Sequence, residues 1–133
     1  MNLPDDELLR RFEDDTLPAE AFHHRDHVRL AWLYLLQEPV LTALECFAEG
    51  LKRFAARQGK PGLYHETITW AYLLLIRERM ARSSPGLTWN EFADRNPDLL
   101  TWKPSVLEGY YREETLSSDL ARRVFVMPDR REG

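Results

Sequence analysis

The sequence predicts an all-α, single-domain helical bundle, and three observations support that fold class. Apolar residues recur three and four positions apart through the long segments between proline and glycine turns. No stretch alternates apolar and polar residues for long enough to form a sheet, and no internal repeat is visible. The chain has 133 residues, of which 44% are hydrophobic, enough for one buried core. We expect one domain over residues 1–133, with about four main helices, short C-terminal helices and an extended tail.

The first helix is predicted over residues 5–13, where apolar side chains fall on one face. Asp5 or Asp6 could cap its first amides, because a short acidic side chain can accept hydrogen bonds there. Residues 1–20 are rich in acidic side chains, so we interpret them as an acidic N-terminal helix followed by a linker.

A second helix is predicted over about residues 24–37. A third begins at Pro39, because proline suits the first turn of a helix. It carries apolar side chains at helical spacing until the turn Gly59–Gly62. There Gly59 can adopt the left-handed conformation that commonly ends a helix.

A fourth helix is predicted over about residues 63–81 and should be central, since Leu73–Ile76 is entirely apolar. Thr88 and Glu91 match a capping box, which predicts the start of a short helix. The remaining chain is more broken. We expect short helices over 97–102, 105–111 and 117–123, an extended apolar segment over 124–128 and a frayed polar tail over 129–133.

The composition argues against several classes of protein. A formal net charge of −4 offers no basic surface for nucleic acid. Cys46 is the single cysteine, so no internal disulfide is expected. Acidic residues stand where a signal peptide would be hydrophobic, and the longest apolar runs are shorter than a membrane span. We therefore expect a cytoplasmic protein with no nucleic-acid or membrane partner.

The four histidines fall in two short polar runs, and each run opens a predicted helix. His24 and His27 are three residues apart and His23 and His27 are four apart, so either pair can share one helix face. A path of three helices reverses direction twice, which should bring the starts of the second and fourth helices to the same end. His27 and His65 should then line one pocket.

This arrangement predicts a candidate metal site at His24, His27 and His65, with zinc or iron as the divalent metal. A carboxylate from Glu66 or Asp26 could complete the ligand shell. Two alternatives stay open: a pocket that functions without metal, and histidines that serve only to cap helices or hydrogen-bond to neighbouring side chains.

The same residues resemble those of a group of small bacterial all-α proteins of uncharacterised function. The shared features are a Phe-x-His-x-x-His helix start, an Ala-Trp-x-Tyr-Leu run, a Tyr-His-Glu-Thr run and a Phe-Val-x-Pro-Asp ending, here Phe22–His27, Ala31–Leu35, Tyr64–Thr67 and Phe125–Asp129. The resemblance implies that His24, His27 and His65 matter more than His23. It implies no particular activity.

The function we expect is the binding of a small molecule in a histidine-lined pocket, with or without a divalent metal. If the protein is an enzyme, we expect acid/base or metal-assisted chemistry in which His27, His65 and Glu66 are the catalytic residues. The alternative is a non-catalytic interaction module or homodimer that uses exposed aromatic residues such as Trp89 and Trp102 and in which the histidines are structural.

Overall fold

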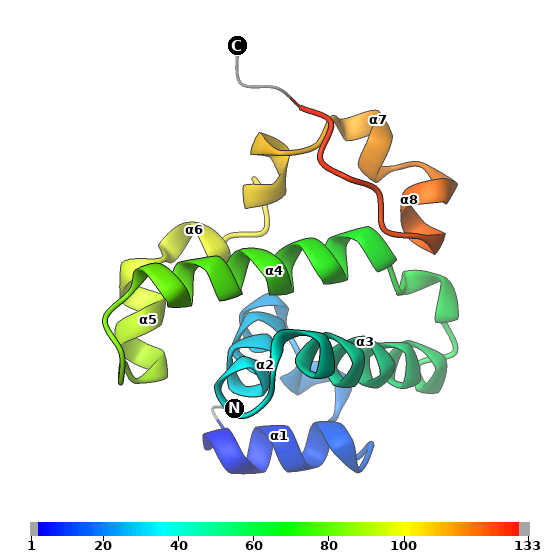
Figure 1. Ribbon diagram of the computed structural model, residues 1–133. Helices are drawn as coiled ribbons and strands as arrows, with labels where there is room; N and C mark the ends of the chain where they lie inside the picture. Colours follow the sequence, from blue (N-terminus) through cyan, green and yellow to red (C-terminus); the bar gives the residue numbers. More distant parts are fainter. Residues whose placement is uncertain (1–2, 131–133) are drawn as a thin grey trace.

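The computed structural model describes residues 3–130 and confirms the all-α class (Figure 1). No strand occurs within those residues. The α-helices and single 3-10 turns (η) are α1 Asp5–Glu13, η1 Ala19–Ala21, α2 His24–Gln37, α3 Val40–Arg57, η2 Pro61–Leu63, α4 Glu66–Arg82, α5 Trp89–Arg95, α6 Pro97–Leu100, η3 Val106–Gly109, α7 Glu113–Leu116 and α8 Asp119–Arg123.

Helix α4 lies at the centre of the fold, between two layers (Figure 1). On one side it packs against α2 and α3, and α1 covers that pair from beyond. On the other side lie the short C-terminal elements, with α5 and α6 near the end of α4 and α8 near its start. The apolar run in α4 explains this position, because Leu73 and Ile76 are fully buried between the layers.

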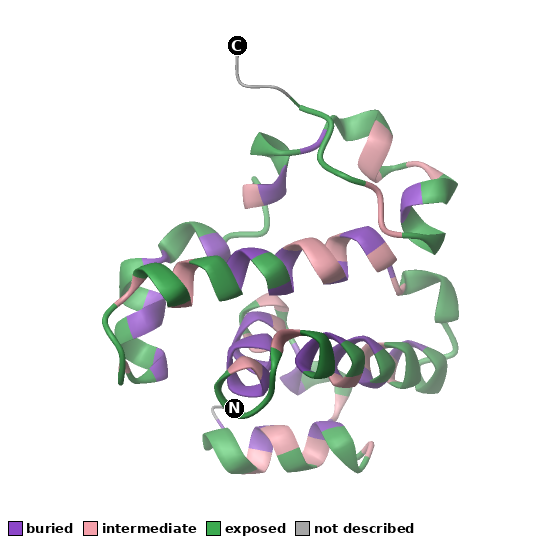
Figure 2. Ribbon diagram, in the orientation of Figure 1, coloured by how far each residue is buried: buried purple, intermediate pink, exposed green. Residues whose placement is uncertain are grey.

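Helix α2 is buried along most of its length (Figure 2), since α1, α3 and α4 all contact it. Its buried run includes one cation, Arg29, which is only 8% exposed. The Arg29 Nε donates to Asp5 Oδ1 over 2.8 Å and so ties α1 to α2. The N-cap of α1 is Pro4 and not Asp5 or Asp6, although Asp6 Oδ1 accepts the first-turn amide of Glu7 over 3.0 Å.

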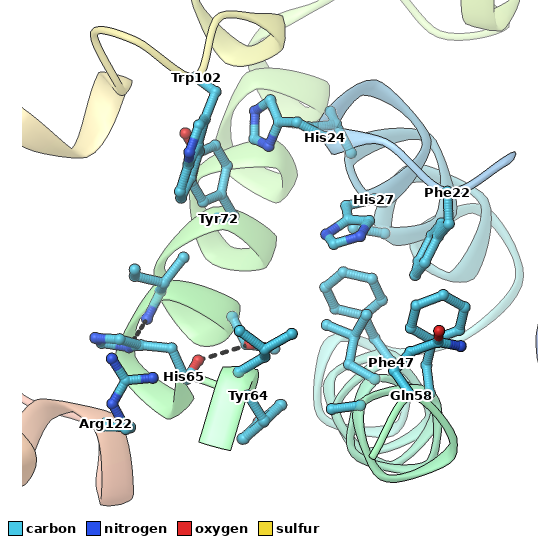
Figure 3. A pocket seen from close by; sticks show the side chains of 18 of the residues that line it. Phe22, His24, His27, Phe47, Gln58, Tyr64, His65, Tyr72, Trp102 and Arg122 are labelled. Carbon is cyan, nitrogen blue, oxygen red and sulfur yellow. Dashed lines mark hydrogen bonds between the residues drawn. The ribbon is translucent and has the colours of Figure 1, made fainter. Parts of the chain in front are cut away.

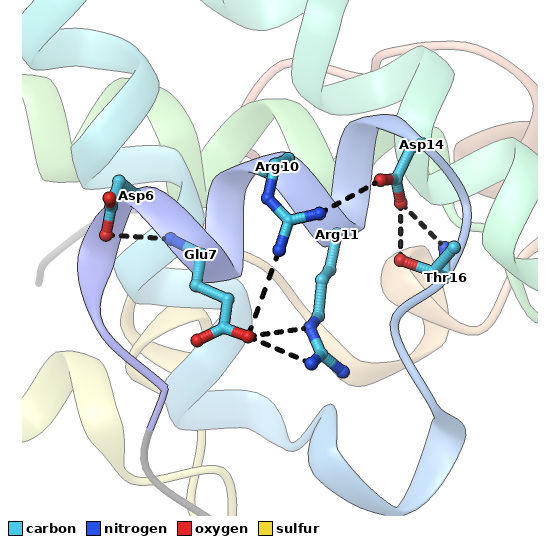
Figure 4. Close-up of polar contacts among 6 residues, drawn as sticks. All are labelled: Asp6, Glu7, Arg10, Arg11, Asp14 and Thr16. Carbon is cyan, nitrogen blue, oxygen red and sulfur yellow. Dashed lines mark hydrogen bonds and ion pairs between the residues drawn. The ribbon is translucent and has the colours of Figure 1, made fainter.

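The outer face of α1 carries ion pairs among its own residues (Figure 4). The guanidinium of Arg11 lies 2.9 Å from the carboxylate of Glu7, and Arg10 lies 3.9 Å from the same carboxylate. Exposed pairs of this kind contribute at most about 1 kcal/mol each to stability. The docking of α1 therefore depends on its buried face, above all on Leu8 and Phe12, each 1% exposed.

The predicted extended tail is present and is bound to the start of α4. The buried hydroxyl of Thr67 donates to Val124 O over 2.9 Å and accepts from Val126 N over 3.0 Å. The ring of Phe125 stacks on Trp70 with 5.1 Å between centroids. These bonds satisfy tail backbone groups that would otherwise depend on water.

The C-terminal part differs from the prediction in two places. Helix α7 was not predicted, and Asp129 is not frayed, because it accepts a hydrogen bond from Arg112 N over 3.0 Å. Arg130 is not frayed either, because its amide donates to Tyr110 O over 3.0 Å. Residues 131–133 of the predicted frayed tail lie outside the described residues. The Thr88–Glu91 capping box is confirmed by reciprocal bonds of 2.9 and 3.2 Å.

Within residues 3–130, no helix combines the length and apolar character that crossing a bilayer requires.

Helix α1 approaches α3 closely where the ring of Phe12 lies over Gly50. A Cβ added at Gly50 would lie 2.2 Å from the Phe12 ring. That ring cannot easily move, because Phe22, Tyr34 and Phe47 surround it with centroids 5.7, 6.2 and 6.5 Å away. Glycine at this position therefore lets α1 pack directly on α3.

We expect Gly50→Ala to lower the free energy of unfolding by about 1–2 kcal/mol, since overpacking outweighs the gain of about 1 kcal/mol in helix propensity. Urea unfolding followed by circular dichroism measures it. Gly109→Ala is the control, because no heavy atom lies within 4 Å of its added Cβ. A Phe12→Leu change should remove most of the penalty, and strict additivity of the two changes would contradict the explanation.

Candidate functional site

A cavity of about 620 Å³ lies between α2, α3 and α4 (Figure 3). Its wall is mainly apolar and aromatic, formed by Phe22, Val28, Ala31, Phe47, Leu51, Phe54, Ala55, Leu63, Ile68, Ile76 and Trp102. Polar side chains enter it at a few points only, namely His24, His27, Gln58, Tyr64, His65, Thr69, Tyr72 and Arg122. His27 and His65 thus line one cavity, as the order of the helices predicts.

The imidazole of His27 extends from the first turn of α2 toward the cavity (Figure 3). Its ring packs on Phe22 with 4.0 Å between centroids. Within residues 3–130 no hydrogen bond reaches the imidazole, yet no fully buried side-chain nitrogen or oxygen lacks a partner there. The nitrogens of His27 are therefore open to the cavity.

Burial, together with the nearby His24 and His23, lowers the pKa of His27 to about 3. The ring is accordingly neutral at physiological pH, with one N–H donor and one acceptor nitrogen. An imidazole with so low a pKa is a weak base, so in this state it is suited to hydrogen bonding more than to proton transfer. Acid/base chemistry near neutral pH relies on the ordinary histidine pKa of 6.5, which His27 does not keep.

His65 has a structural role in this arrangement, because both of its nitrogens are committed. Nδ1 accepts the amide of Ile68 over 3.1 Å and caps α4 (Figure 3). Nε2 donates to Leu116 O over 2.8 Å. Burial lowers the pKa of His65, and the charge of Arg122 lowers it further. Protonation would place a proton on the capping nitrogen and break the cap.

His24 lies at the side of the cavity nearest α6. Its Nε2 donates to Leu99 O over 2.9 Å, and its ring lies 5.1 and 5.0 Å from the centroids of Tyr72 and Trp102. Burial lowers the pKa of His24. Its remaining nitrogen is then an acceptor, because the donor hydrogen is used by Leu99.

Glu66, the predicted base, does not line the cavity. Its carboxylate accepts the hydroxyl of Tyr64 over 2.5 Å in the first turn of α4. Asp26 also serves the backbone, because its carboxylate accepts the amide of His23 over 2.9 Å. His23 itself is exposed. Among residues 3–130, no carboxylate lines the cavity.

Across residues 3–130, no three histidine, cysteine, aspartate or glutamate side chains come close enough together to hold a metal ion. As the rings are placed, His24, His27 and His65 do not converge as ligands, since His24 and His65 bind backbone carbonyls. A zinc or iron centre stays a prediction, and it would need these two rings to exchange their backbone bonds for coordination.

Several lining residues escaped the sequence analysis. From the sequence Arg122 reads as part of a solvated helix end, and Gln58 gives no signal of a site. Arg122 reaches the cavity because α8 packs against α4 and because Arg122 Nη1 donates to Gly62 O over 2.6 Å. The two tryptophans proposed for an interaction surface lie in different surroundings. Trp89 is buried at 7% exposure, whereas Trp102 is 45% exposed and lines the cavity.

Comparisons of this chain with protein families, with curated proteins and with solved structures find no match.

We expect the stability of the protein to fall as the pH is lowered from 7 to 4, partly through His27. The folded pKa of about 3 lies below the ordinary 6.5, so below pH 6.5 the unfolded chain binds a proton that the folded chain does not. One such group contributes a slope of at most about 1.4 kcal/mol per pH unit. His27→Leu should reduce the slope toward acid pH in urea titrations, with His23→Gln as the control for loss of an exposed imidazole. Equal slopes for wild type and His27→Leu would refute this account.

Proposed function

We propose that the protein binds a small, mostly apolar organic molecule in the cavity between α2, α3 and α4, with His27 as its hydrogen-bonding partner. One observation carries this proposal: a neutral imidazole without a protein partner opens into a large apolar cavity. Protein interiors are normally close-packed, and buried polar groups normally find partners. A bound ligand would fill the cavity and also give the His27 imidazole a hydrogen-bond partner.

The dimensions and chemistry of the cavity support this proposal. A volume of about 620 Å³ falls within the range of roughly 300–1,000 Å³ that is usual for small-molecule sites. The aromatic wall favours a flat or extended apolar body, and a few polar groups can fix its orientation. His27 can donate to an oxygen or accept from a hydroxyl or amine, because a neutral imidazole does both.

Occupancy of the cavity can be tested by filling it. Ala55 lines the cavity from α3, whereas its neighbour Ala56 is exposed. We expect Ala55→Leu to weaken binding of the neutral fluorescent probe N-phenyl-1-naphthylamine about tenfold or more, because the added side chain occupies ligand space. Ala56→Leu should bind like wild type. Equal binding by both variants, or no binding by the wild-type protein, would refute the proposal.

The role of His27 can be tested with ligands that differ by one hydroxyl. We expect wild-type protein to bind 1-naphthol about fivefold more tightly than naphthalene, because the hydroxyl can donate to the imidazole. His27→Leu should remove this preference and keep the affinity for naphthalene, as measured by displacement of the fluorescent probe. His23→Gln should preserve the preference. A preference that survives in His27→Leu would exclude His27 as the partner.

A further inference from the structure

We infer that the molecule bound in this cavity is an apolar monocarboxylate whose acid group is held by Arg122 at the α8 side. This inference rests on the proposed function and narrows it to a class of ligand. Three features of the cavity support it: the charges of its lining, the unused N–H donors of Arg122 and the separation of Arg122 from His27.

Arg122 is the one charged side chain among the described residues that line the cavity. The described lining residues include no aspartate or glutamate, and Glu66, outside the lining, accepts a hydrogen bond from Tyr64. The lining histidines His27, His24 and His65 all have lowered pKa values and are neutral at pH 7. The described lining therefore carries one positive charge and no negative charge, which favours an anion over a cation.

The guanidinium of Arg122 has N–H donors that no described hydrogen bond uses. Its described bond runs from Nη1 to Gly62 O, and within residues 3–130 it pairs with no carboxylate. The neighbouring Arg123 behaves differently, because its Nε donates to Asp119 Oδ2 over 2.7 Å. The bond to Gly62 fixes Arg122 across η2, and the remaining N–H groups can bind a carboxylate in the planar geometry that guanidinium prefers.

Arg122 and His27 lie apart in the cavity. Figure 3 shows Arg122 beside His65, on the other side of the cavity from His27 and Phe22. Arg122 is exposed, so an acid group there keeps part of its hydration, while the apolar body of the ligand extends inward. A single guanidinium matches a single negative charge, which favours a monocarboxylate over a doubly charged phosphate.

Decanoate and 1-decanol, which share an apolar chain and differ in charge, provide the test. Their affinities are measured at pH 7 by displacement of N-phenyl-1-naphthylamine from wild-type protein and from Arg122→Met, Arg122→Lys and Arg123→Met. We expect wild type to prefer decanoate by about three- to tenfold, less at high salt. Arg122→Met should abolish the preference, Arg122→Lys should keep part of it, and Arg123→Met should keep all of it.

The outcomes separate this inference from the proposed function. If the probe binds wild type but decanoate is not preferred, or if Arg122→Met weakens decanoate and decanol equally, the acid-group inference is overturned and the cavity site stands. If Arg123→Met abolishes the preference as fully as Arg122→Met, a general surface charge explains it and the inference is again overturned. If the probe does not bind at all, both proposals fall. Thermal unfolding of each variant confirms that the comparison is made on folded protein.

Discussion

The fold depends on how the start of α4 is completed by side chains. His65 caps the helix with one nitrogen and holds Leu116 O with the other, and two residues later Thr67 binds both Val124 and Val126. A helix start leaves amides without partners, and a buried one needs them supplied from elsewhere. Here the same few residues meet that need and also attach Leu116, Val124 and Val126 to the start of α4, whereas α6 is held elsewhere by the bond from His24 to Leu99 O.

The attachment explains how the cavity acquires its wall. Because Leu116 and the tail are held at the start of α4, α8 packs against α4 and Arg122 reaches Gly62 O. The opposite, aromatic side comes from Phe22, just before α2, and from Phe47 and Phe54 of α3. His27 differs from His65 in having no such commitment, so its neutral ring faces the cavity without a described hydrogen bond. The two histidines share a cavity and have different roles.

The spacing of apolar residues and the proline and glycine turns predict the long helices well, because these signals are local in the sequence. The bounds of α1 and α2, the left-handed Gly59 and the Thr88 capping box all follow from neighbours in sequence. Helix order alone was also enough to place His27 and His65 at one cavity. Hydrogen-bond partners that are distant in sequence could not be predicted in this way. Examples are Leu116 for His65, Asp5 for Arg29 and Gly62 for Arg122. Leu116 decides that His65 is structural, whereas Glu66 is held away from the cavity by a partner close in sequence, the hydroxyl of Tyr64.

The bonds of Thr67 have a consequence for how the chain is made. Its hydroxyl is buried in the finished fold, yet its partners Val124 and Val126 follow it by 57 and 59 residues in the sequence. During synthesis α1, α2 and α3 can pack as they emerge, whereas the hydroxyl of Thr67 stays unpaired until residues 124 and 126 have been made. A chain that stops before these residues would present an unfinished helix start to the cellular quality-control machinery.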